Sequence, residues 1–441
     1  MPEPAHADLF ESATPVPSPF VEGLNPDQLD AVVHAGGPLL VVAGAGSGKT
    51  RVLTHRIAHL IHEGVHPSRI LAITFTNKAA AEMRERVGTL VGPVVRTMWV
   101  STFHSACVRI LRADGDRLGY PRQFSIYDQA DAVRLTGYVI RDLHLDSKRF
   151  TPRGVHGLIS LWKNELLDPA GAAARAGNVF DRKHADIYAE YQARLHKAGA
   201  MDFDDLLVNV VRLFREHPDV LQKYRERFEH ILVDEYQDTN QAQNEIVLLL
   251  AGGHQNVCVV GDSDQSVYRF RGADFRNILQ FEDAFPEVTT IVLDQNYRST
   301  QTILDAANAV ISNNVERKPK ALWTDSGHGD RIVRYHADDE GDEATWVGHT
   351  TRRLHGDEGV NFREVAVLYR TNAQSRVIEE AFMRLGVPYK VVGGTRFYDR
   401  REIKDAMAYL RAVINPADEV SVKRIINVPK RGIGDASIDR L

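Results

Sequence analysis

The sequence predicts an α/β fold in which helices cover both faces of a parallel sheet. Six short apolar runs rich in β-branched residues recur along the chain, and each is followed by a polar turn and then by helical periodicity. Runs that are apolar on both faces are typical of strands buried in a parallel sheet. The six runs span residues 38–44, 70–76, 98–103, 230–235, 256–262 and 289–294.

A long helical stretch separates the third of these runs from the fourth. Residues 106–200 contain several helical patterns and no comparable strand run. We therefore expect a helical insertion domain at 106–200, placed inside a first core that is made of residues 20–105 and 201–290.

A second α/β unit is expected after residue 291. A helical pattern at 299–314 is followed by three further strand-like runs, and the chain then becomes helical again. The three runs span residues 331–337, 364–371 and 388–394. We expect an incomplete second core at 291–411 and the start of a second helical insertion at 412–441. Residues 1–19 contain five prolines and predict a mobile arm.

Composition excludes several classes of protein. The chain has 441 residues, a net charge of −5 and two cysteines, Cys107 and Cys258, which are too few for a disulfide framework or a cysteine-rich metal site. No apolar run approaches the roughly 18 residues of a membrane span, and the N-terminus lacks a secretory pattern. We expect a soluble cytoplasmic protein whose contacts with polyanions are local.

The stretch AGAGSGKT follows the first predicted strand and precedes its helix, which is the context of a P-loop. Its glycines let backbone N–H groups converge on phosphate oxygens, Lys49 adds a positive charge, and Thr50 offers a hydroxyl ligand to Mg²⁺. The stretch predicts a nucleotide site, although the first position is alanine where glycine is usual. The alternative is an ordinary glycine-rich turn. The residues concerned are Ala43, Gly44, Ala45, Gly46, Ser47, Gly48, Lys49 and Thr50, with Arg51 next in the chain.

Two adjacent carboxylates end the fourth predicted strand in LVDEYQD. Asp234 suits a magnesium ligand, and Glu235 suits a group that polarises an attacking water. Water is then the phosphoryl acceptor, so the residues favour a hydrolase over a kinase. The alternative is that Asp238 and Thr239 cap the following helix, a role that we expect for Thr239.

Many ordered segments together resemble the superfamily 1 helicases and, within them, the UvrD/Rep family of DNA helicases. The long separation of Lys49 from Asp234 requires an insertion within the core, as in that family. The matching segments are LNPDQLDAV (24–32), AGAGSGKT (43–50), AITFTNKAAAEM (72–83), STFHS (101–105), DFDDLL (202–207), VDEYQDTN (233–240), GDSDQSVYRFRGAD (261–274), LDQNYRS (293–299) and GGTRFYDRREIKDAMAYLR (393–411).

The resemblance implies a RecA-like P-loop core with a helical insertion, followed by an incomplete second RecA-like core. It also implies an ATP- and Mg²⁺-dependent motor that moves 3′ to 5′ on single-stranded DNA and acts at junctions of single- and double-stranded DNA in repair or replication. The family pattern normally continues into a Lys-Gly DNA-contact segment and a late arginine. We therefore expect this chain to be the N-terminal part of a larger motor protein, and we expect the chain itself to hydrolyse ATP weakly. The alternative is a module that binds ATP and single-stranded DNA without motor activity.

The resemblance assigns Gln28 to the adenine edge, Arg298 to the γ-phosphate and Tyr297 to a stacking position near the base. Each has a structural alternative. Asn25 and Gln28 can form the capping box of a helix, which is compatible with adenine contact. Ser299 can cap the following helix while Arg298 lies in solvent.

The loop at 261–274 joins two kinds of chemistry. The resemblance places Gln265 where it senses the γ-phosphate or the attacking water. Tyr268, Phe270 and Arg271 follow within a few residues, and aromatic rings and guanidinium groups can grip a single strand. One loop would then couple hydrolysis to strand movement. The family usually has tryptophan at the position of Phe270, whose alternative is a place in the core.

Four further residues are expected at the DNA by resemblance: Phe75, Asn77, Thr102 and His104. They lie at the ends of two predicted strands, which should meet on the same face. Phe75 could equally be a core residue. The carboxylates of DFDDLL are expected to be surface or capping groups.

Overall fold

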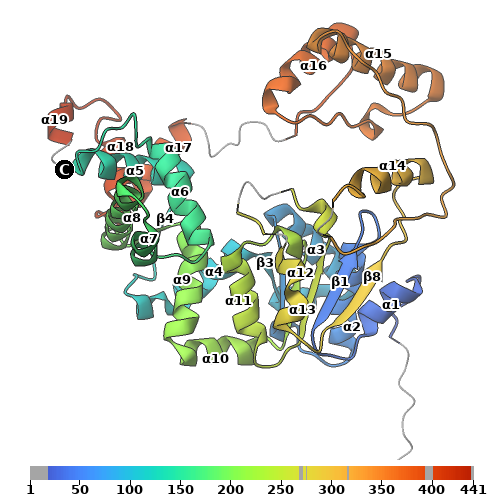
Figure 1. Ribbon diagram of the computed structural model, residues 1–441, viewed down its shortest axis with the longest axis horizontal. Coiled ribbons are helices and arrows are strands. Elements are labelled where there is room, and N and C mark those ends of the chain that lie inside the picture. The colour runs from blue at the N-terminus through green and yellow to red at the C-terminus, as the bar shows by residue number, and fades with distance from the viewer. Residues whose placement is uncertain (1–17, 268–271, 275, 315–316, 393–400, 439–441) are drawn as a thin grey trace, which may run out of the picture. The chain divides into compact units, whose positions relative to one another are not determined.

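The computed structural model describes residues 18–267, 272–274, 276–314, 317–392 and 401–438 (Figure 1). The chain forms two compact units. The first contains residues up to 329 together with 411–423 and 432–441, and the second contains residues 330–410 and 424–431. Among the described helices, none combines the length and the apolar character that a membrane crossing requires.

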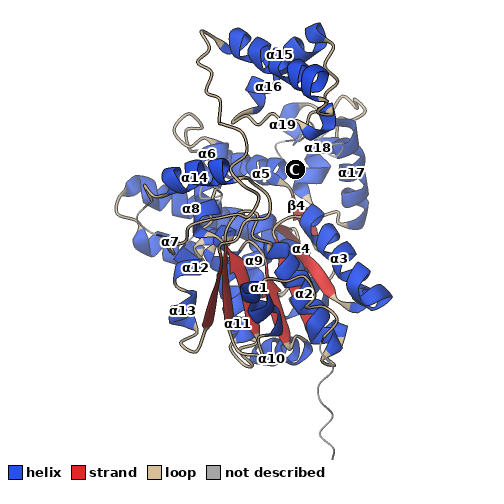
Figure 2. Cartoon of the chain, turned by 90° about the vertical axis from the view of Figure 1, so that its right-hand side faces the viewer, coloured by secondary structure: helices blue, strands red, loops and turns tan. Residues whose placement is uncertain are grey.

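The first unit is built on a parallel sheet, whose strands are drawn in red in Figure 2. The sheet has six strands in the order β3-β2-β6-β7-β1-β8. All six strands predicted from the sequence are confirmed. Their bounds are β1 (Leu39–Ala43), β2 (Ile70–Thr74), β3 (Trp99–Thr102), β6 (His230–Val233), β7 (Val257–Gly261) and β8 (Thr289–Leu293).

Helices cover both faces of this sheet because successive side chains of each strand point to opposite faces. In β1, Leu40 and Val42 join one hydrophobic cluster, whereas Leu39 and Val41 join the other. Each fully buried leucine or valine contributes roughly 1.5–3 kcal/mol. The second cluster lies under α1 (Pro26–Val33), α2 (Lys49–His62) and α3 (Asn77–Val91), and the first lies under α4 (Phe103–Asp114), α9 (Phe203–Glu216), α10 (Pro218–Arg227), α11 (Gln241–Ala251), α12 (Arg276–Leu279) and α13 (Phe281–Ala284).

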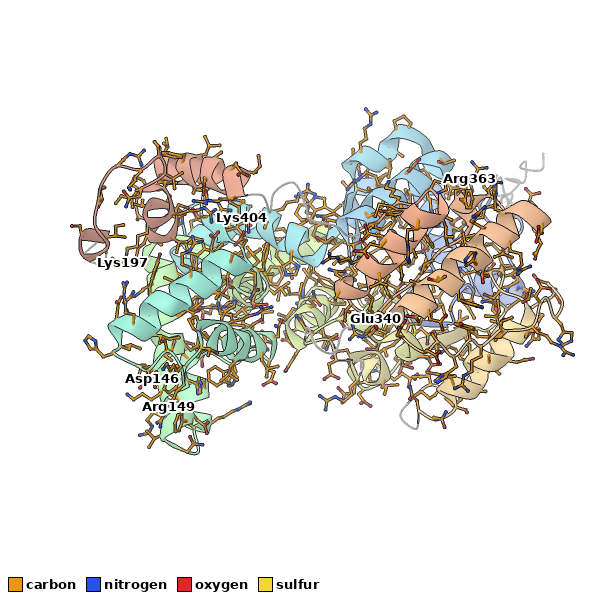
Figure 3. The ribbon with its side chains drawn as sticks, turned by 90° about the horizontal axis from the view of Figure 1, so that it is seen from above. Asp146, Arg149, Lys197, Glu340, Arg363 and Lys404 are labelled. Atoms are coloured by element: carbon orange, nitrogen blue, oxygen red, sulfur yellow. The ribbon has the colours of Figure 1, made fainter. Side chains whose placement is uncertain are left out.

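A separate hydrophobic cluster occupies the helical stretch between β3 and β6. It also includes a detail that the sequence did not reveal, a short parallel pair of strands, β4 (Ser125–Tyr127) and β5 (Ala200–Asp202). Charged side chains such as Asp146, Arg149 and Lys197 project outward from this region (Figure 3). Its helices are α5 (Gln129–Asp142), α6 (Pro152–Asn164), α7 (Pro169–Arg175) and α8 (Val179–Lys197).

Residues near the C-terminal end of the chain return to this helical region. Val420 lies in its hydrophobic cluster, and the Tyr127 hydroxyl donates a hydrogen bond of 2.5 Å to Asp418 Oδ1. Residues 411–423 of the first unit, which include the start of the segment expected to begin a second helical insertion, therefore pack against the first insertion. The last helices of the chain are α17 (Arg401–Ile414), α18 (Glu419–Ile425) and α19 (Asp435–Ile438).

The second unit contains two packed helices, α15 (Glu340–Glu358) and α16 (Asn372–Leu385). The prediction of three strands here is wrong, because the described residues of 331–337, 364–371 and 388–394 form no strand. Val333, Leu368 and Val392 are 74%, 89% and 86% exposed. A run rich in β-branched residues forms a strand only where a partner strand can pair with it. Among the described residues, no strand pairs with any of these three runs.

Shorter elements connect these parts. The helix predicted at 299–314 is confirmed as α14 (Gln301–Ile311), which belongs to the first unit. Short 3₁₀ helices are η1 (Pro67–Arg69), η2 (Gly92–Thr97), η3 (Gly115–Leu118), η4 (Tyr236–Asp238), η5 (Ser263–Gln265) and η7 (Phe362–Glu364).

A buried ion cluster fastens α6 to the start of α9. Lys163 Nζ lies 2.7 Å from Asp202 Oδ2 and 2.8 Å from Asp205 Oδ1. Asp202 caps α9 in a capping box with Asp205, as expected, but neither carboxylate is at the surface. Of the two expected roles, surface or capping, the capping role is confirmed for this pair, and a buried lysine on a helix distant in sequence compensates their charge.

We predict that Lys163→Met destabilises the protein by roughly 3–5 kcal/mol, because two buried carboxylates lose their cation. Chemical denaturation would measure the change. Lys183→Met is the matched control, since Lys183 makes only a half-exposed pair with Asp186 and should change stability by less than about 1 kcal/mol. Equal effects of the two substitutions would contradict the role of the buried cluster.

Candidate active site

The P-loop connects β1 to α2 and depends on glycine at two positions. Gly46 and Gly48 have φ angles of 71° and 91°, a region that other residues adopt only with strain. A Cβ atom at Gly46 would lie 2.6 Å from Asn296 Nδ2, and one at Gly48 would lie 2.8 Å from Gln28 Nε2. Gly48 directly precedes the N-terminus of α2, where backbone N–H groups and the helix dipole favour an anion.

Gln28 holds the P-loop from the adjacent helix. The capping box with Asn25 is confirmed, and the Gln28 Nε2 group also donates a hydrogen bond of 2.9 Å to the carbonyl oxygen of Ser47. The side chain is almost fully buried, with 1% of its surface exposed. Gln28 therefore supports the loop directly, and its contact with adenine stays a prediction.

A closed ring of hydrogen bonds joins the ends of β1, β6 and β7. Lys49 Nζ donates to Glu235 Oε2 at 3.0 Å and to Gln265 Oε1 at 3.2 Å. Gln265 Nε2 donates to Asp262 Oδ2 at 2.6 Å. Gln237 closes the ring, because its amide nitrogen donates to Glu235 Oε2 at 2.9 Å and its oxygen accepts from the Asp262 backbone N–H at 2.9 Å. We call these five residues the Lys49 ring.

The strand order explains why the ring can form. β6, β7 and β1 are consecutive neighbours in the sheet, so their carboxyl ends meet at one edge. The sequence placed Lys49, Glu235 and Gln265 in the site but missed Gln237. Its position inside VDEYQD was the available signal, since a buried amide beside two carboxylates needs hydrogen-bond partners.

Asp234 and Glu235 have different environments although they are adjacent. Burial, together with the negative charge of Glu235, raises the pKa of Asp234 to about 7. Glu235 has a φ of 51° and a ψ of 44°, a left-handed conformation that costs a non-glycine residue about 1–3 kcal/mol. The Glu235 backbone N–H donates to Asp234 Oδ1 at 3.0 Å, while the Glu235 side chain contacts Lys49.

The site offers oxygen ligands suited to Mg²⁺. Thr50 supplies a hydroxyl and Asp234 a buried carboxylate whose charge a divalent cation would compensate. No cluster of three or more acidic, histidine or cysteine side chains suited to a metal occurs among the described residues. This donor set fits a magnesium ion that completes its shell with phosphate oxygens and water, as is usual for Mg²⁺.

The helix after this segment, α11, has a different N-cap from the one predicted. Its N-cap is Asn240, in a capping box with Gln243, and the prediction of Thr239 as the cap is wrong. The 3₁₀ turn η4 follows Glu235 directly and occupies the residues before the helix. Thr239 instead donates from its hydroxyl to the Tyr236 carbonyl oxygen at 2.7 Å. Burial, with the charge of Glu235, raises the pKa of Asp238 in η4 to about 6.

The segment after β8 lies against the P-loop. Asn296 Nδ2 donates to the Ala45 carbonyl oxygen at 2.5 Å, and the Tyr297 backbone N–H donates to the Gly46 carbonyl oxygen at 3.0 Å. These bonds use carbonyl groups, so they occupy none of the backbone N–H groups of the P-loop. A Cβ at Gly46 would lie 2.8 Å from the Cβ of Arg298. The base of the Arg298 side chain therefore lies beside the P-loop, and the residue is exposed.

Two side chains of this segment are defined further. The Tyr297 hydroxyl accepts a hydrogen bond of 2.9 Å from Asn25 Nδ2, which places its ring beside the first helix. Ser299 does not cap α14, because the N-cap is Thr300, and no side-chain hydrogen bond caps this helix. The Ser299 backbone N–H donates to Asn296 Oδ1, so the turn itself is organised by Asn296.

The residues expected at DNA lie at the carboxyl edge of β2 and β3. Thr74 pairs with Thr102 in the sheet, so the segments that follow these two strands lie side by side. Phe75 is half-buried and Asn77 is exposed at the start of α3. Thr102 is buried, and its hydroxyl accepts a hydrogen bond of 3.3 Å from the Ser105 backbone N–H, which makes it the N-cap of α4.

His104 lies beside an aromatic residue that the sequence did not single out. Its ring makes an edge-to-face contact with Phe203 at a centroid separation of 6.0 Å, and Phe203 is 47% exposed. Burial lowers the pKa of His104. Tyr268, Phe270 and Arg271 lie outside the described residues.

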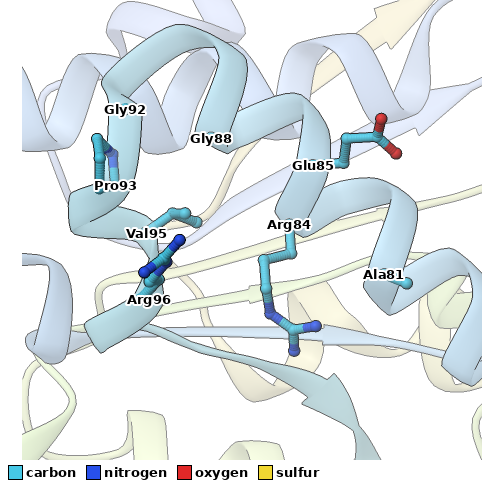
Figure 4. Close-up of a pocket in the computed structure, with 8 residues that line it drawn as sticks. All are labelled: Ala81, Arg84, Glu85, Gly88, Gly92, Pro93, Val95 and Arg96. Atoms are coloured by element: carbon cyan, nitrogen blue, oxygen red, sulfur yellow. The ribbon is translucent and has the colours of Figure 1, made fainter.

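A shallow hollow of about 470 Å³ lies away from these residues, along the second half of α3 and η2 (Figure 4). None of the residues predicted for the nucleotide or DNA lines it. Its lining residues are Ala81, Arg84, Glu85, Gly88, Gly92, Pro93, Val95 and Arg96.

The sheet, the P-loop and the Lys49 ring define a P-loop protein of the α/β class. Two family models match the chain, the UvrD/REP helicase N-terminal domain over residues 24–286 and the UvrD-like helicase C-terminal domain over residues 291–441. The chain belongs to the UvrD/Rep helicase family. The second match corrects the expectation that only the N-terminal part of the family pattern is present, since it extends over residues 291–441.

Curated relatives of this family are similar over nearly the whole chain. The chain is 53% identical to the ATP-dependent DNA helicase PcrA of Bacillus subtilis over 423 residues, which are 96% of the chain and 57% of that relative. It is 53% identical to PcrA of Staphylococcus aureus over 419 residues, with 95% and 57% covered, and to PcrA of Staphylococcus epidermidis over 423 residues, with 96% and 58% covered. The chain thus spans less than three-fifths of the length of these relatives.

We predict that Gly261→Ala destabilises the protein by about 1–3 kcal/mol through overpacking. A Cβ here would lie 2.7 Å from Gln237 Oε1 and 2.8 Å from Ile278 Cδ1. Denaturant titration would measure the change. Gly157→Ala is the control, because open space surrounds this helical glycine and alanine there should stabilise by about 0.5–1 kcal/mol. A neutral Gly261→Ala would mean that Gln237 is not tightly packed.

Proposed function

We propose that this protein is an ATP-dependent DNA helicase or translocase that couples ATP hydrolysis to 3′ to 5′ movement along single-stranded DNA, in the cytoplasm. Family membership supports this proposal, as does the similarity to PcrA relatives that are named ATP-dependent DNA helicases. The observation that carries it is the Lys49 ring, because it joins a P-loop lysine, an acidic residue and a glutamine that is a candidate sensor of the γ-phosphate or of the attacking water. Action at junctions of single- and double-stranded DNA in repair or replication is part of the same proposal.

The ring can change partners when ATP binds. The Lys49 ammonium group would leave Glu235 and Gln265 for the phosphate oxygens, because these carry more negative charge. The Glu235 carboxylate would then be free to accept a proton from the attacking water. Thr50 and Asp234 would hold Mg²⁺, which supplies further compensation of the phosphate charge.

Two other side chains would complete the reaction site. The Cβ atom of Arg298 lies beside Gly46. The guanidinium group of Arg298 would stabilise the negative charge that develops on the γ-phosphate. Tyr297, on the side of Asn25 and Gln28, would stack near the adenine.

The carboxyl edge of β2 and β3 would contact the DNA strand. Phe75, Asn77, His104 and the exposed ring of Phe203 gather there, and aromatic rings stack on bases of any sequence with about 1–3 kcal/mol each. Thr102 would act mainly by fixing the start of α4. Tyr268, Phe270 and Arg271 are proposed to bind the same strand, on the family resemblance alone.

We predict that Glu235→Gln lowers DNA-stimulated ATP turnover by roughly a thousandfold, because an amide cannot accept the proton. Phosphate release with and without single-stranded DNA would measure turnover, and a fluorescent ATP analogue would show that nucleotide binding persists. Glu226→Gln, at an exposed position of α10, is the control. Unchanged turnover in Glu235→Gln would refute the assignment. ATP and DNA binding by the unaltered chain without turnover would favour a non-motor binding module.

A further inference from the structure

A buried cluster of charged residues contacts Asp262 and Asp264, the two carboxylates that precede Gln265 in the chain. Lys320 Nζ forms ion pairs with Asp262 and with Asp264, the second at 2.5 Å, and 2% of the Lys320 side chain is exposed. Arg317 also binds Asp264, with two nitrogen–oxygen distances of 3.0 Å. Neither basic residue belongs to the segments on which the family resemblance rests.

The cluster fixes the orientation of the Gln265 amide. An ionised lysine can only donate hydrogen bonds, and a carboxylate paired with a cation can only accept them. Because Gln265 lies between Lys49 and Asp262, its nitrogen must face Asp262 and its oxygen must face Lys49. The group presented to the P-loop is therefore a hydrogen-bond acceptor, which suits the orientation of a water molecule better than the binding of a phosphate oxygen.

The same segment reaches the turn that contains Arg298. Three residues after Lys320, the Trp323 carbonyl oxygen accepts a hydrogen bond of 2.7 Å from the Asn296 backbone N–H. Leu322 lies against Gly44 of the P-loop, and its carbonyl oxygen accepts a hydrogen bond of 3.0 Å from Asn308 of α14. Residues 317–323 thus contact the Gln265 loop at one end and the Arg298 turn at the other.

We propose that Lys320 is a positioning residue for ATP hydrolysis, and that it acts through Asp262 to hold the Gln265 carbonyl oxygen toward the attacking water. Arg317 assists by holding Asp264. Because residues 317–323 contact both segments, the cluster also fixes the position of the Gln265 loop relative to the Arg298 turn. This inference rests on the proposed function, since it assigns a role within the same reaction.

Lys320→Met tests the proposal in two ways. The first readout is the NMR signal of the Gln265 side-chain amide in ¹⁵N-labelled protein without nucleotide, which is assigned by its loss in Gln265→Ala. In Lys320→Met, the chemical shift of this signal should move toward that of a solvent-exposed glutamine side chain. The second readout is ATP turnover with saturating single-stranded DNA. Here kcat should fall roughly 10- to 100-fold, because the attacking water is no longer held in place. KM for ATP and the affinity for ADP should stay within about twofold. Lys320→Arg should retain most of the turnover.

Lys318→Met is the matched control, because Lys318 lies two residues away and pairs with the partly exposed Glu282 at 2.5 Å, outside the Gln265 cluster. It should leave the amide signal and kcat unchanged. If Lys320→Met binds ADP normally and changes neither readout, the proposal is overturned. If Lys320→Met fails to bind ADP because it does not fold, Arg317→Met decides in its place, with smaller shifts of both readouts in the same direction.

The two proposals fail in distinguishable ways. Absence of ATP turnover in the unaltered chain would reject the proposed function, and the amide signal alone would then decide whether Lys320 positions Gln265. Normal turnover in the unaltered chain, with Lys320→Met indistinguishable from it, would reject only the role of Lys320.

Discussion

The contact of the Lys49 ammonium group with Glu235 and Gln265 is the interaction on which the rest of the site depends. A lysine with 10% of its side chain exposed needs compensating partners, and these come from the ends of two other strands. Three chain segments far apart in sequence are thereby fixed within hydrogen-bond distance of one point. Because 36% of the Glu235 side chain is exposed, phosphate can replace it at Lys49 without leaving a fully buried carboxylate unpaired.

The sheet topology allows a large helical region to be inserted without disturbing this point. β3 is an edge strand, so the chain can leave the sheet after it and return to the central strand β6. The return is secured by Lys163, which pairs with Asp202 and Asp205 where α9 begins. The packing of α9 beneath the sheet then places Phe203 beside His104, so an ion pair in the insertion also shapes the candidate DNA surface.

Strain and close packing are concentrated around the ring. Glu235 adopts a left-handed backbone conformation, and Gly261 leaves space for Gln237 that a side chain would fill. Such features persist only where surrounding contacts over-determine them, and they are common at functional sites. Here the contacts are the hydrogen bonds of Gln237 and Asp262, and the Asp262 carboxylate also forms an ion pair with Lys320.

The sequence by itself determined the six strands of the first sheet, the P-loop and the Asn25 capping box, because each is encoded by neighbouring residues or by local periodicity. It failed where the outcome depends on distant partners. The runs at 331–337, 364–371 and 388–394 have strand composition, yet a strand exists only with a neighbour to pair with. The displaced cap at Asn240 follows from the turn after Glu235, and Gln237 and Lys320 join the site through residues far along the chain. Tertiary structure alone decides such contacts, because burial creates the need for a partner and the fold selects which one is near.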